Sequence, residues 1–456
     1  MYKNDTICGI ATGLGKSAIG MIRVSGPEAI KVCSEIFRGK KKIEEMETFT
    51  AAFGKITDGN DTLDEAIVLV MKAPHTYTTE DVVEINLHGG TYVVKRVLGL
   101  LIDRGVRVAE PGEFTKRAFL GGRIDMTEAE AVMDVINAET DKALRASVNQ
   151  LTGRLRDKVK SFREKILYQS AYIESALDDP ENYSLDGFAE KLKEEIEDIR
   201  SDIKKLLSTS EEGRIIREGI STAIVGRPNV GKSSVLNMIL EEERAIVTDI
   251  EGTTRDTLEE YVNIGGIVLR LIDTAGIRET EDIVERIGVD RARDTLDRAD
   301  LVLLILDGSE SLSEDDREIM SEIEGKTVIT LINKSDKQQL VRAEDLPQFL
   351  TKNLIEVSAR TGEGLDRLKA LITELFMNDN LDYNDQIYIT NARHKAGLVS
   401  AGESLEKVLD SIEAGLGEDF YTIDLMAAYE SLGEIIGETL EDDLADKIFS
   451  EFCMGK

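Results

Sequence analysis

A glycine-rich segment in the middle of the chain constrains the fold more than any other part of the sequence. Residues 226–233 read Gly-Arg-Pro-Asn-Val-Gly-Lys-Ser and match the whole pattern G-x-x-x-x-G-K-[ST]. Residues 220–225 are typical of a short buried strand, and an apolar-striped helix starts at residue 234. A loop between such elements turns backbone N–H groups toward a phosphate chain. We therefore predict a nucleoside triphosphate site in which Lys232 contacts the β- and γ-phosphates and Ser233 holds Mg²⁺.

The sequence around this loop alternates between strand and helix patterns from residue 216 to about residue 378. Further strands are expected near 267–272, 301–306, 327–332 and 354–357. The run from Leu301 to Leu306 is unbroken and apolar, as expected of a strand covered on both faces. This alternation predicts a doubly wound, mostly parallel α/β sheet.

Three short motifs, each after an expected strand, indicate that the base is guanine. In Asn333-Lys334-Ser335-Asp336, the carboxylate of Asp336 can accept bonds from guanine N1–H and from the 2-amino group, a pair that adenine lacks. The backbone N–H groups of residues 358–360 (Ser-Ala-Arg) can meet guanine O6. In Asp273-Thr274-Ala275-Gly276, the carboxylate would hold Mg²⁺ through water and the glycine N–H would contact the γ-phosphate.

A segment between these motifs has the position of a nucleotide-sensing switch. Residues 252–256 read Gly-Thr-Thr-Arg-Asp, and Thr254 is placed to complete the Mg²⁺ shell when GTP is bound. Hydrolysis also needs a group that orients water, but Ile277 stands where many GTPases have glutamine. The acidic stretch 279–285 offers substitutes, of which we choose Glu285; the alternative is a carboxylate on a helix surface. Arg255 and Arg278 are candidate arginine fingers or solvated side chains.

Bulk properties exclude several other classes of protein. The 456 residues suggest roughly three domains at about 150 residues each. No apolar run approaches the ~20 residues needed to cross a bilayer, and no signal peptide is visible, so we expect a cytoplasmic protein. The net charge of −32 argues against coating nucleic acid, so any tRNA contact must be spatially confined. Three scattered cysteines are too few for a disulfide framework.

The flanking sequence is of two kinds. Residues 1 to about 120 look mixed α/β, with strands at 18–24 and 66–70 and a helix at 92–101. Residues 125–212 and 379–456 look helical. Leu192, Ile196, Ile199, Ile203 and Leu206 form an amphipathic stripe, which predicts a bundle core or, alternatively, a partner-binding coiled coil. The segment 13–17 (Gly-Leu-Gly-Lys-Ser) lacks the first glycine of a phosphate loop, and we interpret it as a loop before a strand.

Segments at both ends of the chain narrow the class. The central motifs resemble those of Era-like translation GTPases. Outside them, residues 5–7 read DTI, 20–26 read GMIRVSG, 88–90 read HGG and 111–120 read PGEFTKRAFL, and the chain ends FCMGK. Over its whole length the sequence therefore resembles the MnmE (also called TrmE) family of tRNA uridine-modifying GTPases.

The resemblance implies three structural parts. Residues 1–120 would form an N-terminal α+β domain similar to the tetrahydrofolate-binding domain of aminomethyltransferases, through which a homodimer forms. Residues 121–215 and 379–456 would form a helical bundle domain, which ends in the C-x-G-K motif. The P-loop GTPase domain, residues 216–378, would be inserted between the two helical pieces.

The resemblance also implies a reaction. With the flavin protein MnmG, members of the family add an aminomethyl or carboxymethylaminomethyl group to carbon 5 of the wobble uridine of certain tRNAs. FAD enters only through that partner, with which the dimer forms a heterotetramer. A formyl- or methylene-tetrahydrofolate would be bound by Arg23, Glu84, Arg123 and Lys456. Cys453 is implied to lie near this chemistry, and the alternative is a structural thiol.

In this family potassium takes the place of the arginine finger. K⁺ would be held by the side chain of Asn229 and the backbone of Thr248, Ile250 and Thr253, and Mg²⁺ by Ser233 and Thr254. The family's water-orienting glutamate matches Glu285. Motifs and resemblance together place the following residues around the nucleotide: Asn229, Val230, Gly231, Lys232, Ser233, Ser234, Thr248, Asp249, Ile250, Glu251, Gly252, Thr253, Thr254, Asp273, Thr274, Ala275, Gly276, Asn333, Lys334, Asp336, Ser358, Ala359 and Arg360.

Two other functions are compatible with part of the sequence. An Era-like regulatory GTPase in ribosome assembly would share the central domain, but the chain lacks a C-terminal KH-type GxxG segment and is strongly acidic. A one-carbon transferase with a vestigial GTPase domain is disfavoured because every nucleotide motif is intact.

Overall fold

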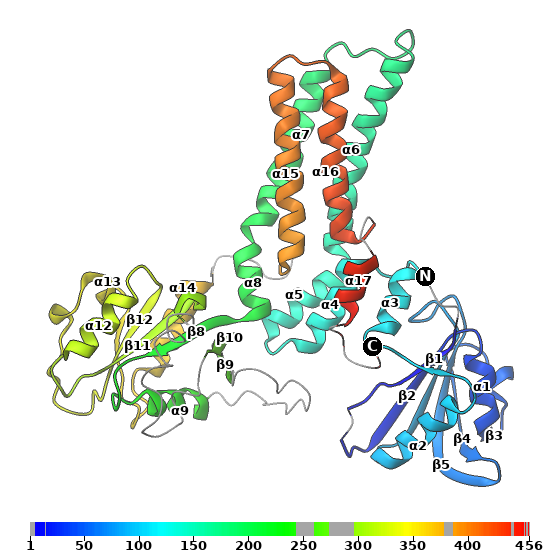
Figure 1. Cartoon of the computed structure of the whole chain (residues 1–456), viewed down its shortest axis with the longest axis horizontal. Coiled ribbons are helices and arrows are strands. Elements are labelled where there is room, and N and C mark those ends of the chain that lie inside the picture. Colours follow the sequence, from blue (N-terminus) through cyan, green and yellow to red (C-terminus); the bar gives the residue numbers. More distant parts are fainter. Residues whose placement is uncertain are drawn as a thin grey trace. The chain divides into compact units, whose positions relative to one another are not determined.

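The computed structural model describes residues 5–13, 15–242, 260–272, 296–377, 386–438, 442–450, 452 and 455. The chain divides into two compact units, drawn together in Figure 1. The first consists of Met1–Met133, Gln150–Lys193 and Ser400–Lys456, and the second of Asp134–Asn149 and Glu194–Val399. No helix in the described parts of the chain is both long and apolar enough to cross a bilayer.

The first unit begins with a seven-stranded sheet of strand order β3-β4-β5-β6-β2-β1-β7. Its strands are β1 (Ile7–Ile10), β2 (Ile19–Ser25), β3 (Phe37–Gly39), β4 (Thr50–Asp58), β5 (Asp61–Met71), β6 (Val82–His88) and β7 (Arg107–Val108). Neighbours are antiparallel except β1 and β7. Helices α1 (Ala29–Ile36) and α2 (Thr91–Ile102) pack with the sheet in one apolar core.

The strand and helix expected near residues 18–24 and 92–101 are confirmed as β2 and α2. Strand β5 is longer than the apolar run 66–70 that predicted it. Its polar first half, which includes Asp64 and Glu65, pairs with β4 in a hairpin. Backbone hydrogen bonds between the strands, rather than apolar side chains, extend this element.

A buried arginine holds the segment 111–120 in place. Helix α3 (Glu113–Leu120) follows a turn at Gly112, and the side chain of Arg117 is 3% exposed. Its guanidinium donates to Asp5 at 2.7 Å, Glu113 at 2.9 Å and Glu80 at 3.1 Å. Because a buried guanidinium is tolerated only when its donors are satisfied, these carboxylates fix α3 against the N-terminal strand.

The remaining helices of the chain surround the two sheets' domains in sequence rather than interrupting them. They are α4 (Met126–Asn137), α5 (Asp141–Leu151), α6 (Arg154–Asp178), α7 (Phe188–Ser208), α8 (Ser210–Glu218), α15 (Ala392–Glu413), α16 (Glu418–Ile436) and α17 (Asp442–Ser450). In the first unit α16 packs along α6, with the guanidinium of Arg163 4.0 Å from the ring centre of Tyr429. The five residues of the predicted stripe on α7 are all buried, which confirms it as a core face.

The second unit contains a six-stranded sheet of order β13-β12-β11-β8-β10-β9. Its elements are β8 (Ile220–Val225), α9 (Lys232–Glu242), β9 (Glu260–Ile264), β10 (Ile267–Leu271), β11 (Leu301–Asp307), α12 (Glu314–Glu322), β12 (Val328–Asn333), α13 (Gln348–Thr351), β13 (Leu354–Glu356) and α14 (Leu365–Phe376). All pairs are parallel except β9 with β10. The expected doubly wound fold is confirmed.

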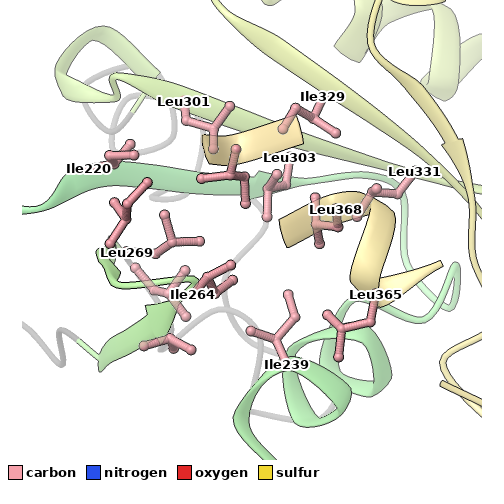
Figure 2. Packing of buried hydrophobic residues seen from close by; sticks show 14 of the residues in the cluster. Ile220, Ile239, Ile264, Leu269, Leu301, Leu303, Ile329, Leu331, Leu365 and Leu368 are labelled. Atoms are coloured by element: carbon pink, nitrogen blue, oxygen red, sulfur yellow. The ribbon is translucent and has the colours of Figure 1, made fainter. Parts of the chain in front are cut away.

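Two apolar clusters cover the sheet of the second unit, one on each face. Figure 2 shows the first, in which Leu301 and Leu303 of β11 lie with Ile239 of α9 and Leu368 of α14. The second cluster takes Val302, Leu304 and Leu306 from the same strand. Every residue of β11 is buried, as its unbroken apolar sequence predicted.

Candidate functional site

The phosphate loop joins β8 to α9 in the second unit. Gly226 and Gly231 have φ values of +150° and +99°, and Asn229 has +65°. A Cβ on Gly226 would lie 2.4 Å from the carbonyl oxygen of Ile305, and one on Gly231 would lie 2.3 Å from Nδ2 of Asn333. Only glycine fits these two positions, because of both backbone conformation and close packing. The helix starts at Lys232, two residues earlier than predicted, so its first turn faces the loop.

Lys232 is held inside this loop. Its ammonium group donates to the carbonyl oxygens of Gly226 at 2.6 Å and Arg227 at 2.9 Å. Burial lowers the pKa of Lys232, because desolvation disfavours its charged form. The ammonium group therefore lies where the oxygens of a bound phosphate chain could accept its hydrogen bonds.

Asn333, at the end of β12, connects the phosphate loop to the loop after β13. Its Nδ2 donates to the carbonyl oxygen of Val230 at 2.9 Å, and its Oδ1 accepts from the backbone N–H of Ala359 at 3.2 Å. The side chain is 2% exposed. One buried amide thus sets the position of the phosphate-binding loop relative to the base-reading loop.

Asp336 has two neighbours from the loop after β13. Its Oδ1 accepts from the hydroxyl of Ser358 at 2.7 Å, and its Oδ2 lies 2.8 Å from Nη2 of Arg360. The bond from Ser358, followed by that from Arg360, lowers the pKa of Asp336. The carboxylate is therefore ionised at neutral pH, as acceptance of two guanine N–H groups requires.

Lys334 has a partner that sequence analysis missed. Its ammonium group forms an ion pair with Asp307, at the end of β11, and lies 3.4 Å from the carbonyl oxygen of Asn229. Asp307 is 5% exposed. Burial opposes its ionisation, but bonds from Lys334 and Ser309 outweigh this effect and lower its pKa. An acidic residue at the carboxyl end of a parallel strand was the available signal.

The structure brings together the described members of the predicted nucleotide site. The phosphate loop, Asn333, Lys334 and Asp336 meet the loop 358–360 beyond the ends of β8, β12 and β13. Other predicted residues lie outside the described part of the chain: Thr248, Asp249, Ile250, Glu251, Gly252, Thr253, Thr254, Asp273, Thr274, Ala275, Gly276, Glu285, Cys453 and Lys456. Their roles stay predictions.

A second group of predicted residues meets in the first unit. Arg23 on β2 and Glu84 on β6 are cross-strand neighbours, and Nη2 of Arg23 lies 2.8 Å from Oε1 of Glu84. The guanidinium carbons of Arg23 and Arg123 lie 5.4 Å and 4.8 Å from the ring centre of Tyr77. Phe114 lies on the other contact of Arg23, at 5.7 Å. Sequence analysis missed both aromatic residues, which no motif identified.

The C-terminus contributes to this part of the first unit. Gly455 has a φ of +88°, and a Cβ there would lie 2.3 Å from the carbonyl oxygen of Ile10. The tail therefore lies against β1, whose Gly9 pairs with Arg23. Upstream, Phe449 and Phe452 pack with Met126 in a small apolar cluster. Such packing explains why a glycine precedes the last residue.

The other glycine-rich segment, residues 13–17, belongs to neither group. Its described residues form a loop before β2, as predicted. The backbone N–H of Ser17 donates to the carbonyl oxygen of Gly89, and a Cβ on Gly89 would lie 2.2 Å from the carbonyl oxygen of Ser17. The segment is thus packed against the end of β6.

A doubly wound sheet with a phosphate loop, a carboxylate at the guanine-reading position and intact flanking motifs defines the class of P-loop GTPases. Family models described as "MnmE helical domain" and "GTP-binding protein TrmE N-terminus" match residues 126–453 and 6–123. Proteins named tRNA modification GTPase MnmE from Lachnoclostridium phytofermentans and Streptococcus thermophilus are 50% and 48% identical. The first alignment covers 100% of both chains, and the second covers 99% of this chain and 98% of the relative. The chain belongs to the MnmE family of tRNA modification GTPases.

The solved structures include Aquifex aeolicus Era bound to GDP·AlF4⁻. It is 30% identical, covers 40% of this chain and 65% of its own, and has a TM-score of 0.26. The full-length relatives, which carry the family assignment, do not favour the alternative of an Era-like ribosome-assembly GTPase.

Proposed function

We propose that this chain is a potassium-activated GTP hydrolase that modifies tRNA together with the flavin protein MnmG. The pair adds an aminomethyl or carboxymethylaminomethyl group to carbon 5 of the wobble uridine, with a one-carbon unit from tetrahydrofolate. The observation that supports this most strongly is the match to relatives named tRNA modification GTPase along the whole chain. FAD is supplied by the partner, and the reaction takes place in the cytoplasm.

The nucleotide part of the proposal assigns a role to each group of residues. Asp336 reads guanine, Lys232 and the loop amides bind the phosphates, and Ser233 with Thr254 holds Mg²⁺. The bonds of Asn333 to Val230 and Ala359 support this assignment, because they hold the two loops at a defined separation before nucleotide binds. Mg²⁺ would neutralise charge that develops on the phosphate oxygens.

The folate part rests on Arg23, Glu84, Arg123 and the C-terminal Lys456. Planar guanidinium groups beside an aromatic ring favour a flat heterocycle with its own donors and acceptors, such as a pterin. The side chains of Arg23 and Glu84 are 17% and 15% exposed, so solvent still reaches them. The position of Gly455 against β1 supports a contribution from the C-terminal residue.

A homodimer through the N-terminal domain is part of the same proposal. Phe53 on β4 and Ile67 on β5 are cross-strand neighbours with exposed fractions of 65% and 51%. Large apolar side chains paired on one face of a sheet are typical of an interaction surface. A second copy of the chain is the occupant we propose, with MnmG joining the dimer as a heterotetramer.

We expect hydrolysis of GTP to be at least roughly tenfold faster in KCl than in NaCl of equal concentration, because a cation at the bridging oxygens stabilises developing charge. Asn229 is the proposed side-chain ligand. Its φ of +65° suits glycine, so Asn229→Gly removes the amide without backbone strain. Phosphate release should then lose most of its preference for KCl. Equal rates of the wild-type protein in the two salts would contradict the potassium assignment.

Mass analysis of tRNA from a deletion strain tests the complete function. We expect carbon-5 aminomethyl-type groups to disappear from wobble uridines and to return with the wild-type gene but not with Lys232→Ala. Ribosome profiles from the same cells provide the comparison with the alternative function. Intact wobble uridines together with a ribosome-assembly defect would replace the proposal by that alternative.

A further inference from the structure

The side chain of Arg360 occupies the carboxylate that reads the base. Both Nε, at 3.1 Å, and Nη2, at 2.8 Å, approach the same oxygen of Asp336, Oδ2. The arginine side chain is 75% exposed, whereas that of Asp336 is 15% exposed. Among the described residues, no other partner of this guanidinium is found. Sequence analysis assigned a role to the backbone of Arg360 but none to its side chain.

A count of acceptor positions shows the consequence for a bound base. An ionised carboxylate offers about four lone-pair positions, two on each oxygen. Arg360 uses both positions on Oδ2, and the hydroxyl of Ser358 uses one on Oδ1. One position is left. Guanine needs two, one for N1–H and one for its 2-amino group, whereas hypoxanthine, which lacks the amino group, needs only one.

We infer that Arg360 competes with the 2-amino group of guanine for Asp336 and thereby sets how strongly the site prefers guanine over hypoxanthine. This inference rests on the proposed role of Asp336 in base reading. When guanine binds, the guanidinium leaves Oδ2 and moves into solvent, which its exposure permits. The ion pair lowers the affinity for guanine nucleotides and satisfies the carboxylate while the site is empty. Hypoxanthine nucleotides leave the ion pair in place.

The test compares GDP with inosine 5′-diphosphate, two ligands that share the ribose, the phosphates and N1–H. Affinities for the full chain and for Arg360→Ala are measured by isothermal titration with Mg²⁺ present. An exposed ion pair contributes little, so we expect GDP to bind Arg360→Ala roughly two- to fivefold more tightly. Inosine diphosphate should bind both proteins with equal affinity. The preference for GDP therefore rises in the variant.

A matched control separates competition from a general effect of charge. Arg367→Ala removes an exposed arginine from α14 of the same domain and should change neither affinity. The inference is overturned if Arg360→Ala binds GDP no better, if both nucleotides gain equally, or if Arg367→Ala reproduces the gain. A wild-type chain that binds no GDP would instead overturn the proposed nucleotide site, and this inference with it.

Discussion

Asp336→Asn should change the base preference of the site from guanine to xanthine. The carboxamide keeps one acceptor for N1–H but presents an N–H₂ group to position 2, where guanine has a donor and xanthine a carbonyl oxygen. Two donors then face each other in the guanine complex, with no water to separate them. We expect GDP affinity to fall roughly 10²-fold or more and XDP affinity to rise by a similar factor.

The environment of Asp336 makes this substitution a mild one for the protein itself. The hydroxyl of Ser358 can donate to the amide oxygen as it now donates to Oδ1, and asparagine has nearly the same shape. Affinities for GDP and XDP are measured by titration with fluorescent nucleotide analogues. Asp315→Asn, on the exposed first turn of α12, removes the same charge and serves as the control. An unchanged ratio of GDP to XDP affinity in Asp336→Asn would remove this residue from base reading.

Glu285→Ala should separate nucleotide binding from hydrolysis. The segment after the D-x-x-G motif has Ile277 where a water-orienting glutamine is common, so the attacking water needs another polar group. If the carboxylate of Glu285 supplies it, its loss leaves the contacts to base and phosphates unchanged. We expect turnover to fall roughly 10²-fold or more, while GDP affinity stays within about twofold.

The neighbouring acidic residues allow a close comparison for this variant. Glu281→Ala removes the same type of side chain from the same stretch and should hydrolyse GTP at nearly the wild-type rate. Single-turnover phosphate release in KCl, with enzyme in excess of GTP, measures the chemical step without product release. If Glu285→Ala keeps the wild-type rate, the residue belongs to the surface and another group orients the water.

The sequence was most informative where the chemistry depends on local backbone geometry. A phosphate loop needs glycine at two positions and lysine and serine at the start of a helix, so residues 226–233 predicted the loop between β8 and α9. The apolar run Leu301–Leu306 predicted a strand buried on both faces. Strand boundaries were less accurate where pairing supplied the stabilisation, as in the polar half of β5.

Contacts between distant segments could not be predicted in the same way. Asp307 pairs with Lys334 because parallel neighbours β11 and β12 end at the same edge of the sheet. Tyr77 meets Arg23 and Arg123 because β2, the loop before β6 and the end of α3 converge in the first unit. Neither pair has a characteristic spacing in the sequence, since packing of the sheet decides which side chains meet.

By itself, the sequence determined the fold class, the order of the nucleotide motifs and the family resemblance, because each depends on residue types at fixed local spacings. Only the tertiary structure decided how these parts interact. It placed the guanidinium of Arg360 on Asp336, a buried amide between two loops at Asn333, and Gly455 against β1. The physical reason is that local patterns follow from backbone geometry, whereas long-range contacts follow from how the buried faces of the elements pack together.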